Sequence, residues 1–142
     1  MDNYDKNFEN FLTYTLKIDC NKATQRFILR NALYYIKDNT DFEIKPEKVA
    51  HNFNCSYKFF NKKLYALTGY KWVELLRYIK LYNSSIILKE KKYSKVYEIP
   101  KMVGYQNYGH WTKNFTLFFG VTPSKYSRRY SKKSAISMNK GL

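Results

Sequence analysis

The chain contains two copies of a short helical pattern, offset by 51 residues. The pairs with identical internal spacing are Phe60 and Trp111, Leu64 and Phe115, Leu67 and Phe118, and Gly69 and Gly120. The residues just before them correspond as well, since Ser56 and Tyr57 of the first copy match Asn107 and Tyr108 of the second. A repeat this short predicts two small and similar helical units within one chain.

Within the first copy the residues predict a helix, a tight turn and a second helix. The first helix begins at Pro46, because the fixed φ of proline suits the first helical turn. It stops at Asn54, since asparagine tolerates the positive φ that a tight turn between helices requires. Ser56 then caps the second helix, whose apolar stripe faces inward. This order is typical of a helix-turn-helix unit.

The second copy follows the same order with different residues. Ser94 is expected to cap its first helix, Gly104 to form the turn and Asn107 to cap its second helix. Pro100 lies inside the first of these helices, where proline should remove one backbone hydrogen bond and kink the helix. Thr122, followed by a proline, opens a last helix as its cap.

A long helix is expected between the two copies, from about residue 72 to residue 91. Its apolar stripe, at steps of three and four residues, consists of Trp72, Leu75, Ile79, Tyr82 and Ile86. About 20 residues at about 1.5 Å each form a rod of roughly 30 Å. One turn of B-DNA is about 34 Å long, so the rod is about the right length to hold two reading helices on successive turns of one DNA face.

The expected fold class is all-α, with two helix-turn-helix subdomains joined by the long linker helix. The expected parts are an N-terminal extension at 1–20, the first subdomain at 21–70, the linker at 71–92, the second subdomain at 93–130 and a flexible basic tail at 131–142. Within the extension, residues 8–18 fit both the alternation of a strand and the face of a helix, and the pattern leaves this choice open.

Charge points to a polyanionic partner. The 142 residues include 26 Lys and Arg against 11 Asp and Glu, for a net charge of +15. Residues 1–20 carry two basic and four acidic side chains, so the positive charge lies after residue 20. A field of this strength attracts polyanions, and together with the repeated unit it points to DNA.

Other classes of protein find little support in the sequence. No apolar run approaches the roughly 18 residues that a transmembrane helix requires, and the polar, acidic start is unlike a signal peptide. Cys20 and Cys55 lack a CxxC pairing, which favours reduced thiols in a cytoplasm. His51 and His110 have no Cys or carboxylate at metal-ligand spacing, and motifs of a phosphate loop or a catalytic nucleophile are missing. We therefore expect no metal, no cofactor and no catalytic residue.

Residues 35–130 resemble the DNA-binding domain of AraC/XylS transcription regulators. The most specific match is GYQNYGHWTKNFTLFFGVTPSKY at 104–126, and VAHNFNCSYKFFNKKLYALTGY at 49–70 matches the first motif of the family. The resemblance implies about seven helices and two major-groove contacts made by one polypeptide. A chain without a large effector domain is similar to the stand-alone members of the MarA type, which bind asymmetric sites as monomers. Lys80 stands where the family commonly has arginine, which would keep a phosphate contact but lose a bidentate one.

Candidate base contacts lie on the outward faces of the second helix of each copy. They are Tyr57, Lys58, Asn61, Lys62, Tyr108, Gly109, His110, Thr112 and Lys113. Asparagine suits the adenine edge of the major groove and lysine the guanine edge, while a glycine allows close approach. For the two tyrosines, packing against a neighbouring helix is an equally good interpretation.

Candidate phosphate contacts combine helix N-termini with basic side chains. They are Ser56, Arg77, Lys80, Asn107 and Lys125.

The sequence thus predicts a sequence-specific regulator of transcription that binds double-stranded DNA in the bacterial cytoplasm, associated with the nucleoid and not with a membrane. Family members usually activate by recruiting RNA polymerase, so an activator is expected. Two alternatives remain. A nonspecific nucleoid or RNA-binding protein would explain the charge without base reading, and an interaction module would dock on a partner protein without DNA.

Overall fold

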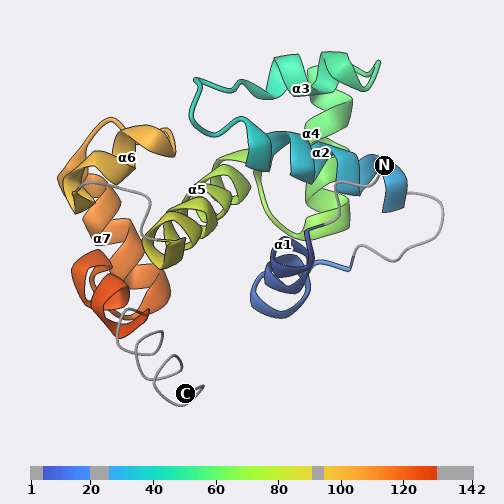
Figure 1. Cartoon of the computed structure of the whole chain (residues 1–142). Coiled ribbons are helices and arrows are strands. Elements are labelled where there is room, and N and C mark those ends of the chain that lie inside the picture. The colour runs from blue at the N-terminus through green and yellow to red at the C-terminus, as the bar shows by residue number, and fades with distance from the viewer. Residues whose placement is uncertain (1–4, 20–25, 91–94, 131–142) are drawn as a thin grey trace. The chain divides into compact units, whose positions relative to one another are not determined.

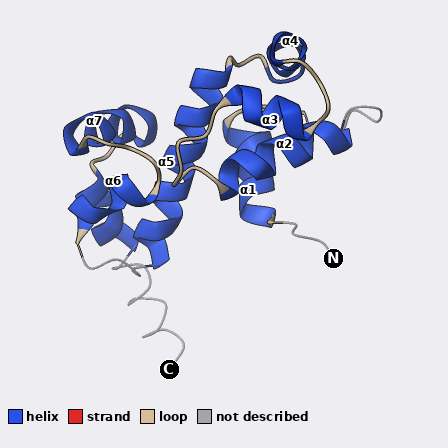
Figure 2. Ribbon diagram, turned by 90° about the horizontal axis from the view of Figure 1, so that it is seen from above, coloured by secondary structure: helices blue, strands red, loops and turns tan. Residues whose placement is uncertain are grey.

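The computed structural model describes residues 5–19, 26–90 and 95–130, and every element in these ranges is helical (Figures 1 and 2). The elements are α1 (Lys6–Asn10), the π-helical turn η1 (Phe11–Thr15), α2 (Arg26–Asp38), α3 (Pro46–Asn52), α4 (Tyr57–Thr68), α5 (Trp72–Glu90), the 3-10 turn η2 (Val96–Glu98), α6 (Ile99–Met102) and α7 (Tyr108–Phe119). Residues 123–130 form a further helix. The predicted all-α fold class is confirmed.

The chain divides into two compact units, and the boundary between them lies within α5, between Tyr82 and Asn83. α5 has 19 residues, close to the expected 72–91, and spans about 28 Å. Four members of the predicted apolar stripe of α5 are buried, and the fifth, Ile86, is half-buried. In the part of the chain that the structure describes, no helix has the length and apolarity to cross a bilayer.

In the first unit, α3 and α4 form the predicted helix-turn-helix. Pro46 occupies the first turn of α3, and Asn54 has a φ of 56° in the turn, as its residue type predicted. The Ser56 hydroxyl accepts a hydrogen bond from the Phe59 backbone N–H at 3.2 Å. Gly69 ends α4 with a φ of 78°. Local turn chemistry therefore sets both ends of α4.

The N-terminal segment is helical and belongs to the core of the first unit. Phe8 and Leu12 are fully buried, and the Phe8 ring lies 5.3 Å from the Tyr82 ring of α5, centroid to centroid. The Asp5 carboxylate accepts a hydrogen bond from the Phe8 backbone N–H at 3.2 Å and so caps α1. The choice between strand and helix that the pattern left open is decided for the helix by this packing.

Two acids of this segment form ion pairs with α2. Arg30 lies 3.0 Å from the Glu9 carboxylate, and Lys37 lies 3.5 Å from that of Asp5. Because these pairs hold two cations of α2 near carboxylates, the positive charge available to an anion shifts to later elements.

In the second unit, a short α6 and α7 form the second helix-turn-helix. Gly104 has a φ of 88° in the turn, and the Asn107 side chain accepts a hydrogen bond from the His110 backbone N–H at 2.9 Å.

The interior position predicted for Pro100 is wrong, because a 3-10 turn precedes α6 and Pro100 stands in the first turn of α6. A proline there breaks no helical hydrogen bond. Ser94 lies outside the described residues, as does the predicted tail.

The second unit is centred on the aromatic side of α7. Trp111 and Phe115 are fully buried, and the Trp111 indole N–H donates to the Ser84 hydroxyl of α5 at 2.8 Å. As predicted, Thr122 caps the last helix, since its hydroxyl accepts a hydrogen bond from the Lys125 backbone N–H at 3.2 Å. Tyr126 of that helix packs edge-on against Phe115, with ring centroids 5.3 Å apart.

We expect Phe8→Ala to lower the free energy of unfolding by about 3–5 kcal/mol, as deletion of a fully buried aromatic side chain does. Tyr14→Ala is the matched control, because Tyr14 lies on the same segment but is 68% exposed. Urea unfolding followed by circular dichroism measures both. Equal, small effects of the two substitutions would show that the segment does not stabilise the first unit.

Candidate nucleic-acid interface

α4 and α7 each bury one face and expose the other. The fourth residue of each helix is a buried aromatic side chain, Phe60 at 6% exposure and Trp111 at 0%. The next inward residues, Leu64 and Phe115, lie one turn further along and are buried too. Side chains on the opposite side of each helix therefore point to solvent.

On α4, most of the predicted base contacts are accessible. Lys58 and Lys62 are exposed, and Tyr57 is 42% exposed. Asn61 is half-buried, and its Oδ1 atom is buried with no hydrogen-bond partner. A bidentate contact to adenine uses both the oxygen and the nitrogen of the amide. Asn61 must therefore turn its side chain to make that contact.

On α7, the equivalent positions behave in a similar way. Gly109, His110 and Lys113 are exposed, and Tyr108 is 46% exposed while its ring lies 5.9 Å from that of Trp111. Thr112, which corresponds to Asn61 of α4, is half-buried and its hydroxyl oxygen is buried without a hydrogen-bond partner. The repeat thus extends to the local environments of these side chains.

The structure gives a second reason for a glycine at position 109, in addition to the predicted close approach of DNA. A Cβ atom at this position would lie 3.3 Å from Oδ1 of Asn107, the atom that caps α7. In α4 the corresponding residues are Lys58 and the cap Ser56. The serine side chain is shorter than that of asparagine, which leaves room for a side chain at position 58. The cap and the residue two positions after it are therefore coupled.

His110 is oriented by two neighbours, Asn114 and Tyr105, that no sequence motif indicated. Its Nε2 atom lies 3.4 Å from the side-chain nitrogen of Asn114, one helical turn later. The same nitrogen donates to the Tyr105 hydroxyl at 3.3 Å, and the Tyr105 ring meets the His110 ring edge-on. The spacing of four residues between His110 and Asn114 is the available sequence signal. These contacts orient the imidazole on the outward face.

The electrostatics of both helices favour an anion. Neither α4 nor α7 contains an acidic residue, so the partial positive charge of each N-terminus is not compensated within its helix. Ser56 and Asn107, the predicted phosphate contacts at these ends, are exposed, although both side chains also serve as caps. Helix N-termini of this kind bind phosphate well.

The remaining predicted phosphate contacts differ in exposure. Arg77 and Lys125 are exposed. Lys80 follows Arg77 on α5 by three residues and is half-buried, and this burial lowers the pKa of its ammonium group. Residues three apart on a helix lie on one face, so Arg77 and Lys80 form one basic site in the first unit.

Among the described residues, no group of three or more His, Cys, Asp or Glu side chains could hold a metal ion.

Comparisons with known proteins point to DNA-binding regulators. The lactose operon transcription activator of Staphylococcus xylosus is 31% identical over 107 residues, which cover 72% of this chain and 37% of that protein. The chain thus spans little more than a third of the length of the curated relatives it matches. No protein-family model matches the chain.

Solved structures give the same picture for the fold. The C-terminal domain of AraT, a response regulator from Geobacillus stearothermophilus, is 25% identical, with a TM-score of 0.62 over 72% of this chain and 84% of that domain. The DNA-binding domain of AdpA, a global transcriptional factor solved in complex with a target DNA, is 18% identical, with a TM-score of 0.65 over 74% of this chain and 94% of that one.

Proposed function

We infer that the chain belongs to the AraC/XylS family of transcription regulators, and we propose that it binds double-stranded DNA sequence-specifically and regulates transcription. α4 and α7 serve as its recognition helices and enter successive major-groove segments of one site. One observation carries this proposal. Each recognition helix is capped by a side chain, buried on one face and lined on the other by exposed residues that suit base edges.

Base contacts are assigned to the outward residues of the two helices. In α4, Lys62 addresses guanine and Asn61 addresses adenine after its amide has turned outward. In α7, Lys113 and the oriented His110 take the corresponding roles. The helix N-termini, together with Arg77, Lys80 and Lys125, contact phosphates and contribute affinity without base preference.

The regulator acts as an activator, as does its relative from Staphylococcus xylosus, the lactose operon transcription activator. Its partners are DNA and RNA polymerase, and it binds DNA as a monomer because one chain already carries two recognition helices. It works in the bacterial cytoplasm, on the nucleoid. No catalytic step belongs to this function.

Selection of binding sites from random duplex DNA tests the proposal. We expect one long asymmetric motif with two conserved blocks about one helical turn apart. A short palindrome would contradict the monomer and point to a dimer. Enrichment of no motif would replace sequence-specific binding with the nonspecific binding of a nucleoid or RNA-binding protein.

Asn61→Ala should remove the preference for one base pair in the half-site bound by α4, at about 1–3 kcal/mol for a bidentate contact. Lys63→Ala is the control, because Lys63 lies on the same helix and is not assigned to a base. Fluorescence anisotropy on the selected site and on single-base variants measures both. An equal loss of affinity on the selected site and on scrambled DNA would make Asn61 a phosphate contact instead.

Lys80→Ala should weaken binding to selected and scrambled DNA alike and reduce the slope of log affinity against log salt by about one unit. Lys6→Ala, which removes an exposed charge from α1, should leave the slope unchanged.

Because burial lowers the pKa of Lys80, its ammonium loses its proton earlier as pH rises. The wild-type affinity should therefore fall at a lower alkaline pH than that of Lys80→Arg. Parallel pH profiles of the two proteins would remove Lys80 from the phosphate contacts.

A further inference from the structure

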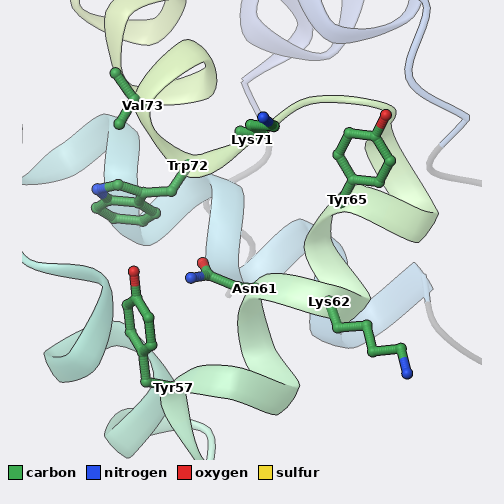
Figure 3. A pocket seen from close by; sticks show the side chains of 7 residues that line it. All are labelled: Tyr57, Asn61, Lys62, Tyr65, Lys71, Trp72 and Val73. Carbon is green, nitrogen blue, oxygen red and sulfur yellow. The ribbon is translucent and has the colours of Figure 1, made fainter.

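A pocket of about 550 Å³ lies beside α4, in the first unit (Figure 3). Its lining comes from Tyr57, Asn61, Lys62 and Tyr65 of α4 and from Lys71, Trp72 and Val73, where α5 begins. This volume is in the range of pockets that bind small molecules in proteins. Nothing in the sequence motifs pointed to it, because it forms only where the start of α5 meets α4.

The walls of the pocket are largely aromatic and apolar. Figure 3 shows the rings of Tyr57 and Trp72 on the same side of Asn61, and the ring of Tyr65 on the other side. Tyr65 is 55% exposed and Val73 is 64% exposed, so these side chains are open to a ligand. Aromatic faces arranged in this way favour a flat, apolar group between them.

The nitrogen atoms of the pocket side chains are hydrogen-bond donors, while the hydroxyl groups of Tyr57 and Tyr65 both donate and accept. Oδ1 of Asn61 is buried, while Figure 3 shows the amide nitrogen directed toward the space between Tyr57 and Trp72. Lys71 also lines the pocket, although Figure 3 shows its ammonium group directed away from the Asn61 amide, and the lining contains no acidic residue. The Lys62 ammonium points away from the two rings. An amide N–H and an ammonium group together suit an anion of low charge, such as a carboxylate.

We propose that this pocket binds a small planar aromatic carboxylate. The aromatic ring lies against Tyr57 and Trp72, and the carboxylate accepts hydrogen bonds from the Asn61 amide nitrogen and from the Lys71 ammonium group after the flexible Lys71 side chain has turned toward the pocket. A bound carboxylate also competes with DNA, because Tyr57, Asn61 and Lys62 line the pocket and belong to the proposed base-contact face. This competition rests on the proposed function, whereas the binding of the carboxylate does not.

Binding is tested by nuclear magnetic resonance titration of the full chain with 2-naphthoate, with naphthalene-2-carboxamide as its uncharged counterpart. We expect saturable shifts at residues 57–65 and 71–73, and a weaker affinity for the carboxamide. Lys71→Ala should weaken 2-naphthoate about tenfold, as for the loss of a hydrogen bond to a charged group. Lys63→Ala removes the same charge outside the pocket and should leave the affinity unchanged.

The alternatives give different results in the same titration. Shifts that do not saturate, or that lie outside the pocket, would overturn the site. Equal affinity for the carboxylate and the carboxamide, or equal losses in Lys71→Ala and Lys63→Ala, would overturn the proposed anion. Tyr57→Ala removes a partly exposed ring that the ligand is proposed to lie against, and unchanged binding in this variant would also count against the site.

Competition is tested by fluorescence anisotropy on the selected DNA site. The apparent dissociation constant for DNA should rise with 2-naphthoate for the wild-type chain and level off once the pocket is filled, because α7 keeps its contact, and it should rise much less for Lys71→Ala. Saturable binding of 2-naphthoate with unchanged DNA affinity would overturn the competition and leave the site. A chain that binds 2-naphthoate in the pocket but no DNA would contradict the proposed function and support the site.

Discussion

One buried aromatic side chain in the first turn of each recognition helix determines which residues face outward. Phe60 and Trp111 occupy the same place in α4 and α7, and both are inaccessible to solvent or nearly so. At 3.6 residues per turn, burial of this position turns the residues one before it and one after it toward the edges of the exposed face. Trp111 further restricts the rotation of α7 about its axis, because its indole N–H donates a hydrogen bond to the Ser84 hydroxyl. The polar faces proposed to bind DNA depend on this packing.

The two units form the same turn between helices with different residues. The residue at each turn or cap position restricts which residues fit beside it. Asn54 accepts the positive φ that Gly104 adopts without cost from a Cβ atom. A Cβ atom two positions after the cap Asn107 would lie 3.3 Å from its capping oxygen, so glycine fits there without a shift, whereas Lys58 stands two positions after the shorter Ser56. A cation at this position of α4 therefore has no counterpart on α7. The difference between the two outward faces is what an asymmetric DNA site requires.

Local chemistry explains what the sequence could and could not predict. Turn residues and caps such as Pro46, Asn54 and Ser56 act over a few residues, so both helix-turn-helix units and their outward faces could be predicted. The N-terminal segment could not, because the π-helical turn at Phe11–Thr15 shifts the register and spoils the helical period. The position of Pro100 was predicted wrongly for a related reason. The 3-10 turn before α6 shortens this helix and leaves Pro100 in its first turn. The roles of individual side chains at the DNA face remain predictions.

The pocket beside α4 depends on tertiary packing, and the repeat shows why it belongs to the first unit. Trp72 is buried and meets Phe60 edge-on, with ring centroids 6.3 Å apart, which brings the start of α5 against α4. The corresponding positions in the second copy hold Pro123 in place of Trp72 and Thr116 in place of Tyr65. Those residues supply no aromatic walls. A planar ligand would therefore act on the half-site of α4 and leave the contact of α7 in place, so it would weaken specific binding without removing the whole protein from DNA.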